Sequence, residues 1–208
     1  MLSNLSFPPR HEGVLRDCPY GESEYDPRIR PWYVAASSGP KDIILVLDTS
    51  GSMENADRMG IMKDAAKRVV NTLGVSDYFS VIEFNGSANT IIANSVDLLQ
   101  RATADNKANA VANINNLRPK GATNFFSGFD LAFKTFSDSE TDELSSGCNK
   151  AILFLTDGEM GDNKDVLFDL LDKKAADYTD NGKSAPVIFT YSFGSGADSV
   201  IPKEIACR

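Results

Sequence analysis

Three side chains that carry oxygen ligands, Asp48, Ser50 and Ser52, directly follow an apolar run. The run, residues 43–47, reads IILVL, which is typical of a strand buried on both faces of a parallel sheet. Ligands of open α/β sheets bind outside the carboxyl ends of the strands. Hard oxygen ligands with few negative charges suit Mg²⁺, Mn²⁺ or Ca²⁺ rather than Zn²⁺. The spacing lets all three side chains face one point, so the segment indicates a divalent-cation site.

Two later segments offer further oxygen ligands in the same setting. Thr123 lies in the loop 121–124, before an aromatic-rich helix, and Asp157 follows a second apolar run, residues 152–155. Taken singly, each of these groups has a simpler explanation as a helix cap or a turn. Three such loops in order, each beside a strand or helix, favour one shared site over separate caps and turns.

The five residues match, one for one, the metal-ion-dependent adhesion site of the von Willebrand factor type A domain family: Asp48, Ser50, Ser52, Thr123 and Asp157. The chain resembles this family from about Pro40 to its C terminus. The resemblance implies a bound Mg²⁺ (or Ca²⁺ or Mn²⁺) with one open coordination position. In the family, an Asp or Glu of a protein partner fills that position.

Apolar strands and helical stripes alternate from residue 41 onward. Met59, Met62 and Ala66 lie at helical spacing, for example, and Asn85-Gly86 signals a hairpin turn. This alternation predicts an α/β fold with a doubly wound, mostly parallel sheet and one antiparallel edge strand. The family resemblance implies the same architecture and usually one more strand, so residues 41–208 are expected to form a C-terminally truncated type A domain.

Residues 1–40 differ from the rest, because they are rich in Pro, Arg and aromatic residues without a clean period. The stretch 25–33, YDPRIRPWY, resembles an element of Cache sensor domains that grips an amino acid. The positions that match this element are Tyr25, Arg30, Trp32 and Tyr33. Arg30 offers a bidentate fork for a carboxylate. The alternative is a linker whose aromatic residues pack on a neighbouring domain, so residues 1–40 are interpreted as a partial Cache-type segment or linker.

A Cache-type segment followed by a type A domain resembles the alpha-two-delta auxiliary subunits of voltage-gated calcium channels and related proteins. This resemblance implies an extracellular or cell-surface, membrane-associated parent, with a channel or the rest of its own chain as partner. It also implies that Cys148 is bridged to a membrane-anchored portion. Taken alone, the three cysteines, Cys18, Cys148 and Cys207, are equally compatible with free thiols.

Composition excludes several classes of function. A net charge of −8 argues against nucleic-acid binding. No apolar stretch reaches the roughly 18 residues that a membrane span requires, so no direct insertion is expected. The N terminus also lacks the apolar core of a secretory signal.

An enzymatic function is not expected. Ser50 stands where an aspartyl-phosphate phosphatase needs a second carboxylate, and the only histidine, His11, lies outside the α/β region. Cys148 has no local base. We therefore expect a binding module. The alternatives are an amino-acid sensor, a metal-assisted hydrolase and an intracellular type A domain that works in assembly of a complex.

Overall fold

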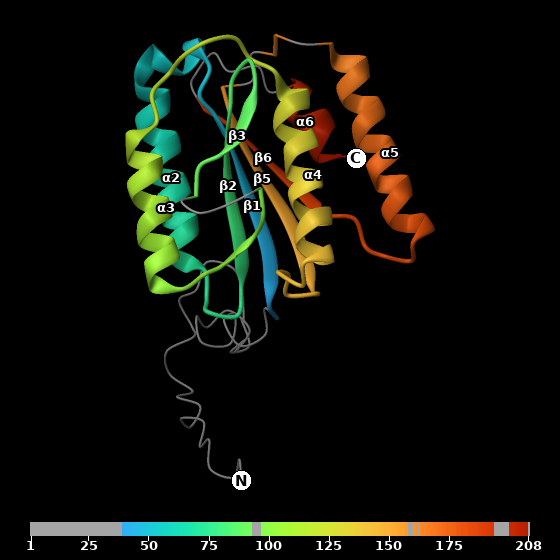
Figure 1. Ribbon diagram of the computed structural model, residues 1–208. Coiled ribbons are helices and arrows are strands. Elements are labelled where there is room, and N and C mark those ends of the chain that lie inside the picture. Colours follow the sequence, from blue (N-terminus) through green and yellow to red (C-terminus); the bar gives the residue numbers. More distant parts are fainter. Residues whose placement is uncertain (1–38, 93–96, 158–159, 162, 194–199, 208) are drawn as a thin grey trace, which may run out of the picture. The chain divides into compact units, whose positions relative to one another are not determined.

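The computed structural model describes residues 39–92, 97–157, 160–161, 163–193 and 200–207 (Figure 1). Several residues singled out from the sequence lie outside these ranges: His11, Cys18, Tyr25, Arg30, Trp32 and Tyr33.

A single six-stranded sheet forms the centre of the fold. Its strands are β1 (Lys41–Asp48), β2 (Tyr78–Phe84), β3 (Ala88–Thr90), β4 (Gln100–Arg101), β5 (Asn149–Thr156) and β6 (Val187–Ser192). The order is β3-β2-β1-β5-β6, and β4 pairs with β2 off this path. The pairs β1–β2, β1–β5 and β5–β6 are parallel, whereas β3 and the two-residue β4 are antiparallel to β2. The predicted fold class is therefore confirmed.

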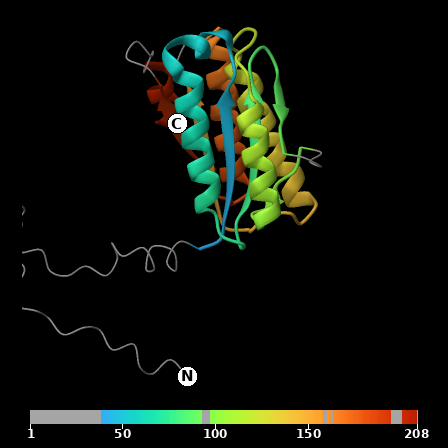
Figure 2. The same cartoon turned by 90° about the vertical axis from the view of Figure 1, so that its left-hand side faces the viewer.

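Helices cover both faces of this sheet. They are η2 (Gly51–Asp57), α2 (Arg58–Thr72), α3 (Ala104–Asn116), α4 (Phe125–Thr141), α5 (Lys164–Asp180) and α6 (Val200–Ala206). The helices α2 and α3 lie on one face, and α4, α5 and α6 lie on the other (Figures 1 and 2). Within the described residues, no helix combines the length and apolarity that a membrane crossing requires.

The alternation of side chains along β1 divides the core between these two layers. Ile43, Leu45 and Leu47 pack with the apolar residues of α2 and α3. Ile44 and Val46 pack with those of α4, α5 and α6. All five side chains are buried, so β1 has the two covered faces that its uninterrupted apolar run predicts.

Aromatic rings dominate the part of the core that lies between the sheet and the helices α4, α5 and α6. The ring centroid of Phe154 in β5 lies 4.7 Å from that of Phe129, 4.8 Å from that of Phe125 and 5.2 Å from that of Phe84. The helix α4 approaches the sheet closely at Gly128, where an added Cβ would lie 3.0 Å from Val46 Cγ1. The strands that end at the site are thus held in place by a tightly packed apolar layer.

Parallel pairing brings the carboxyl ends of β1, β2 and β5 to one edge of the sheet. Asp48 lies opposite Phe84 of β2, and Leu47 lies opposite Leu155 of β5. Thr156 and Asp157 therefore lie next to Asp48, although more than a hundred residues separate them along the chain. This shared edge is where the sequence predicts the site.

Replacing Phe154 by Ala should lower the free energy of unfolding by about 3–5 kcal/mol, because it removes a fully buried ring from the aromatic layer. Urea denaturation followed by circular dichroism measures the change. Val75→Ala is the control, since Val75 is 72% exposed, and it should change stability by no more than about 0.5 kcal/mol. Equal effects of the two substitutions would show that the aromatic layer is not the main source of core stability.

Candidate metal centre

Asp48 is fully buried at the end of β1, and both of its carboxylate oxygens accept hydrogen bonds. The Ser50 N–H donates to Oδ1 over 2.8 Å. The Thr156 hydroxyl donates to Oδ2 over 2.6 Å. One partner lies in the loop after β1 and the other lies in β5, so the carboxylate is fixed in orientation between two elements.

Ser50 and Ser52 place their hydroxyl oxygens side by side, with Oγ atoms 3.1 Å apart. Ser50 occupies the N-cap position of η2, but its side chain makes no capping hydrogen bond. The alternative role of Ser50 as a helix cap is therefore not realised. Two oxygens in adjacent positions of an octahedral Mg²⁺ shell lie about 3 Å apart, because each bond is about 2.1 Å long. The spacing of the two serine hydroxyls fits two such ligands.

The loop that carries Thr123 is bonded through its backbone to the other loops at this edge. The Gly51 N–H donates to the Gly121 carbonyl over 3.1 Å, and the Asn124 N–H donates to the Asn85 carbonyl over 2.8 Å. Thr123 is itself half-buried. The cap of α4 is Asn124, whose side chain accepts from the Ser127 N–H over 2.9 Å. The hydroxyl of Thr123 is thus not used as the cap of this helix.

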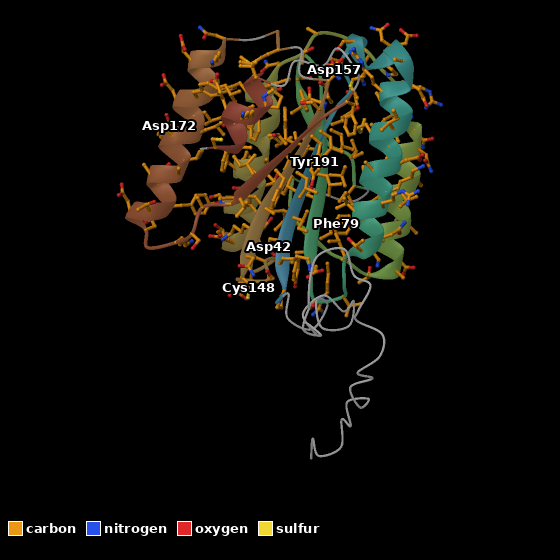
Figure 3. The ribbon with its side chains drawn as sticks, turned by 180° about the vertical axis from the view of Figure 1, so that it is seen from behind. Asp42, Phe79, Cys148, Asp157, Asp172 and Tyr191 are labelled. Atoms are coloured by element: carbon orange, nitrogen blue, oxygen red, sulfur yellow. The ribbon has the colours of Figure 1, made fainter. Side chains whose placement is uncertain are left out.

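Asp157 is fully buried and forms an ion pair with Arg58, the first residue of α2. Arg58 Nη1 lies 2.7 Å from Asp157 Oδ2. The same nitrogen makes a long contact of 3.5 Å with the carbonyl oxygen of Ser52. Figure 3 shows Asp157 at the opposite end of the sheet from Asp42 and Cys148. The arginine therefore connects the loop after β1 with the loop after β5.

The electrostatics of the site favour an additional positive charge. Burial raises the pKa of Asp48, hydrogen bonds from Ser50 and Thr156 lower it, and the charge of Asp157 raises it further. The net pKa of Asp48 is above its ordinary value because burial outweighs the hydrogen bonds. A cation beside both carboxylates would offset this cost.

The described part of the chain contains no group of three or more His, Cys, Asp or Glu side chains that could hold a metal ion. The site instead combines two carboxylates with serine hydroxyls. Neutral oxygen ligands and few carboxylates suit a hard divalent ion that keeps several waters. This set of ligands thus fits Mg²⁺ or a similar ion better than it fits zinc.

The structure brings four of the five predicted residues into one connected cluster. Hydrogen bonds connect Asp48, Ser50 and Ser52, and Arg58 connects Ser52 to Asp157. Thr123 joins through the backbone of its loop. The roles of these five residues as metal ligands remain predictions.

Two residues of the site were not foreseen from the sequence. Thr156 had a detectable signal, because it is the one polar residue between an apolar run and Asp157. Arg58 had none, because a basic residue at the start of a helix is usually exposed to solvent. Of the other residues considered for chemistry, Cys148 is exposed directly before β5, at the end of the sheet away from the site (Figure 3).

Fold and site together define a known class of domain. Residues 43–159 match the von Willebrand factor type A domain, and the chain belongs to that family.

Its relatives include the voltage-dependent calcium channel subunit alpha-2/delta-2 of Homo sapiens, with 31% identity over 184 residues. That match covers 88% of this chain and 15% of the relative. The alpha-2/delta-3 subunit of Rattus norvegicus is 31% identical over 164 residues, which are 79% of this chain and 14% of the relative. The chain thus corresponds to a small part of these subunits.

Solved structures agree with the fold. A von Willebrand factor type A protein from Catenulispora acidiphila superposes with a TM-score of 0.60 at 18% identity, covering 81% of this chain and 42% of that one. Proximal thread matrix protein 1 of the mussel byssus superposes with a TM-score of 0.56 at 22% identity, and the match covers 81% of this chain and 39% of that one. At these identities the likeness concerns the fold alone.

Replacing Thr156 by Val should destabilise the protein by about 1.5–3 kcal/mol, because it removes a hydroxyl that donates to a buried carboxylate. Thr135→Val is the matched control. Thr135 is also fully buried, but its hydroxyl has no hydrogen-bond partner within the described residues, so this change should be neutral or stabilising. Urea denaturation of both variants tests the difference. Similar losses of stability would show that the Thr156–Asp48 bond makes no special contribution.

Proposed function

We propose that this domain is a metal-dependent protein-binding module, which captures an Asp or Glu of a partner through a divalent cation. The observation that carries the proposal is the pair of serine hydroxyl oxygens 3.1 Å apart, next to buried Asp48 at the carboxyl edge of the sheet. A bound Mg²⁺, Ca²⁺ or Mn²⁺ would supply a Lewis-acidic centre for an external carboxylate.

The residues divide this task among them. The Ser50 and Ser52 hydroxyls would be the direct neutral ligands. Both oxygens of Asp48 already accept hydrogen bonds, and Asp48 would supply negative charge and hold metal-bound water. Thr123 and Asp157, from separate loops, would complete the site. Few direct carboxylates leave the ion electrophilic, which favours binding of an acid from outside.

Binding is favoured over catalysis by the chemistry of the same edge. Ser50 stands two residues after Asp48, where phosphatase chemistry would need a second carboxylate as acid or base. Asp157 is engaged by Arg58 rather than presented as a general base. We therefore propose a non-enzymatic adhesion-type role.

The relatives suggest the setting in which the module works. Because they are voltage-dependent calcium channel subunits, we propose that the domain belongs to a related cell-surface or extracellular, membrane-associated protein. Its acidic partner would be a membrane channel or another part of its own chain. A Cache-type amino-acid site at Tyr25, Arg30, Trp32 and Tyr33 stays a prediction.

Calorimetric titration with Mg²⁺ and Mn²⁺ tests the metal site. Asp48→Asn preserves the shape of the side chain but removes its charge, and it should weaken metal binding by about 10- to 100-fold. Asp42→Asn is the matched control, because Asp42 is a buried acid at the other end of the same strand, where it accepts from the Ser146 N–H over 2.8 Å. Wild-type affinity in Asp48→Asn would exclude this site.

Acetate tests the open coordination position without knowledge of the partner. The methyl resonance of acetate should broaden in the presence of the Mn²⁺-loaded protein, because a carboxylate on the ion lies close to its unpaired electrons. In Asp48→Asn the broadening should fall to the level that free Mn²⁺ causes at the same free concentration. If metal binds but acetate is not broadened beyond the free-ion level, the site has no place for an external acid.

A further inference from the structure

The positively charged side chain of Arg58 lies within the site that we propose for a divalent metal ion. Its side chain is only 11% exposed, and its partner Asp157 is fully buried. An ion pair this deeply buried is costly to break, because the carboxylate would be left without a counter-charge. The pair is therefore a fixed part of the site in the absence of metal.

The ion pair also changes the charge that an arriving metal ion meets. Asp48 and Asp157 are both fully buried acids at the same edge of the sheet. The guanidinium compensates one of these charges through its 2.7 Å contact with Asp157 Oδ2. It thereby engages one of the two carboxylate oxygens of Asp157.

The backbone directly before Arg58 has an uncommon conformation at two successive residues. Ala56 (φ 50°) and Asp57 (φ 55°) are both in the left-handed region, which a residue with a Cβ rarely adopts. The Arg58 N–H closes the turn by bonding to the carbonyls of Asn55 and Met53. The Asp57 side chain lies over Gly60, where an added Cβ would be 2.3 Å from Asp57 Oδ1 and would force that side chain to move.

We infer that Arg58 is a built-in counter-cation that competes with the divalent ion for Asp157 and thereby sets the metal affinity of the site. The inference rests on the proposed function and deepens it. In the metal-free protein, Arg58 stabilises the buried carboxylate. When a metal ion binds, it takes over this task, and the contact between Arg58 and Asp157 weakens. Because Arg58 begins α2 and also contacts the Ser52 carbonyl, metal loading is transmitted to the start of this helix.

Calorimetry with Mg²⁺ on the Arg58→Gln variant tests the inference. The variant should bind Mg²⁺ about tenfold more tightly than the wild type, because the competing positive charge is gone. Its metal-free form should melt at a lower temperature, and saturating Mg²⁺ should raise that temperature by more than in the wild type. Arg58→Lys keeps the charge, so its affinity should stay near the wild-type value.

Lys41→Gln is the matched control. Lys41 also pairs with a buried carboxylate, since its Nζ lies 3.0 Å from Asp77 Oδ2, but it does so at the other end of β1. This variant should also lose stability, whereas its affinity for Mg²⁺ should not change. A purely structural Arg58 would behave like Lys41, with lower stability and no gain in affinity.

Nuclear magnetic resonance of the wild-type protein gives a second test, which does not depend on the metal-free Arg58→Gln variant being folded. The side-chain ¹⁵N–¹H resonances of Arg58 in the wild-type protein, assigned with Arg58→Lys, should shift during a Mg²⁺ titration as the contact with Asp157 weakens. If the wild type binds Mg²⁺ but these resonances do not move, or if Arg58→Gln binds no more tightly, the role of Arg58 is overturned while the metal site stands. If neither protein binds Mg²⁺, the proposed function itself fails.

Discussion

The rest of the site depends on the carboxylate of Asp48, which is bonded on one side to the Ser50 N–H and on the other to the Thr156 hydroxyl. The first bond lies in the loop after β1, in which the hydroxyl oxygens of Ser50 and Ser52 are 3.1 Å apart. The second bond fixes the end of β5 against the end of β1, which places Asp157 at the same edge. One buried acid thus organises two loops that lie far apart in the sequence.

Such an arrangement has an energetic cost that the remainder of the fold must offset. Two carboxylates are fully buried close together, and burial of charge opposes folding. The apolar layers on both faces of the sheet supply the compensating stability, and the aromatic cluster around Phe154 lies directly beneath this edge. Part of the buried negative charge is compensated within the structure, because Arg58 forms an ion pair with Asp157.

The sequence predicts much of this molecule because its main signals are local. The apolar run of β1 indicates a doubly covered strand, and parallel strands must end at a shared edge, so the meeting of Asp48 with Asp157 follows from topology. The ion pair of Arg58 does not follow from topology, because it joins residues 99 positions apart and depends on a side-chain conformation. Helix capping was ambiguous for a similar reason, since Thr123 and Asn124 are both good caps and only the backbone geometry selects Asn124.

The position of Cys148 determines the direction in which a pulling force would act on the domain. The cysteine is exposed directly before β5, while the edge proposed to bind metal lies where that strand ends (Figure 3). A covalent tether at this thiol and a partner held at the opposite edge would pull along the strand axis. The parallel strands β1 and β5 would then resist this force, because many inter-strand hydrogen bonds would have to break together in shear rather than one after another. The geometry suits a connector that must transmit tension between two attached bodies.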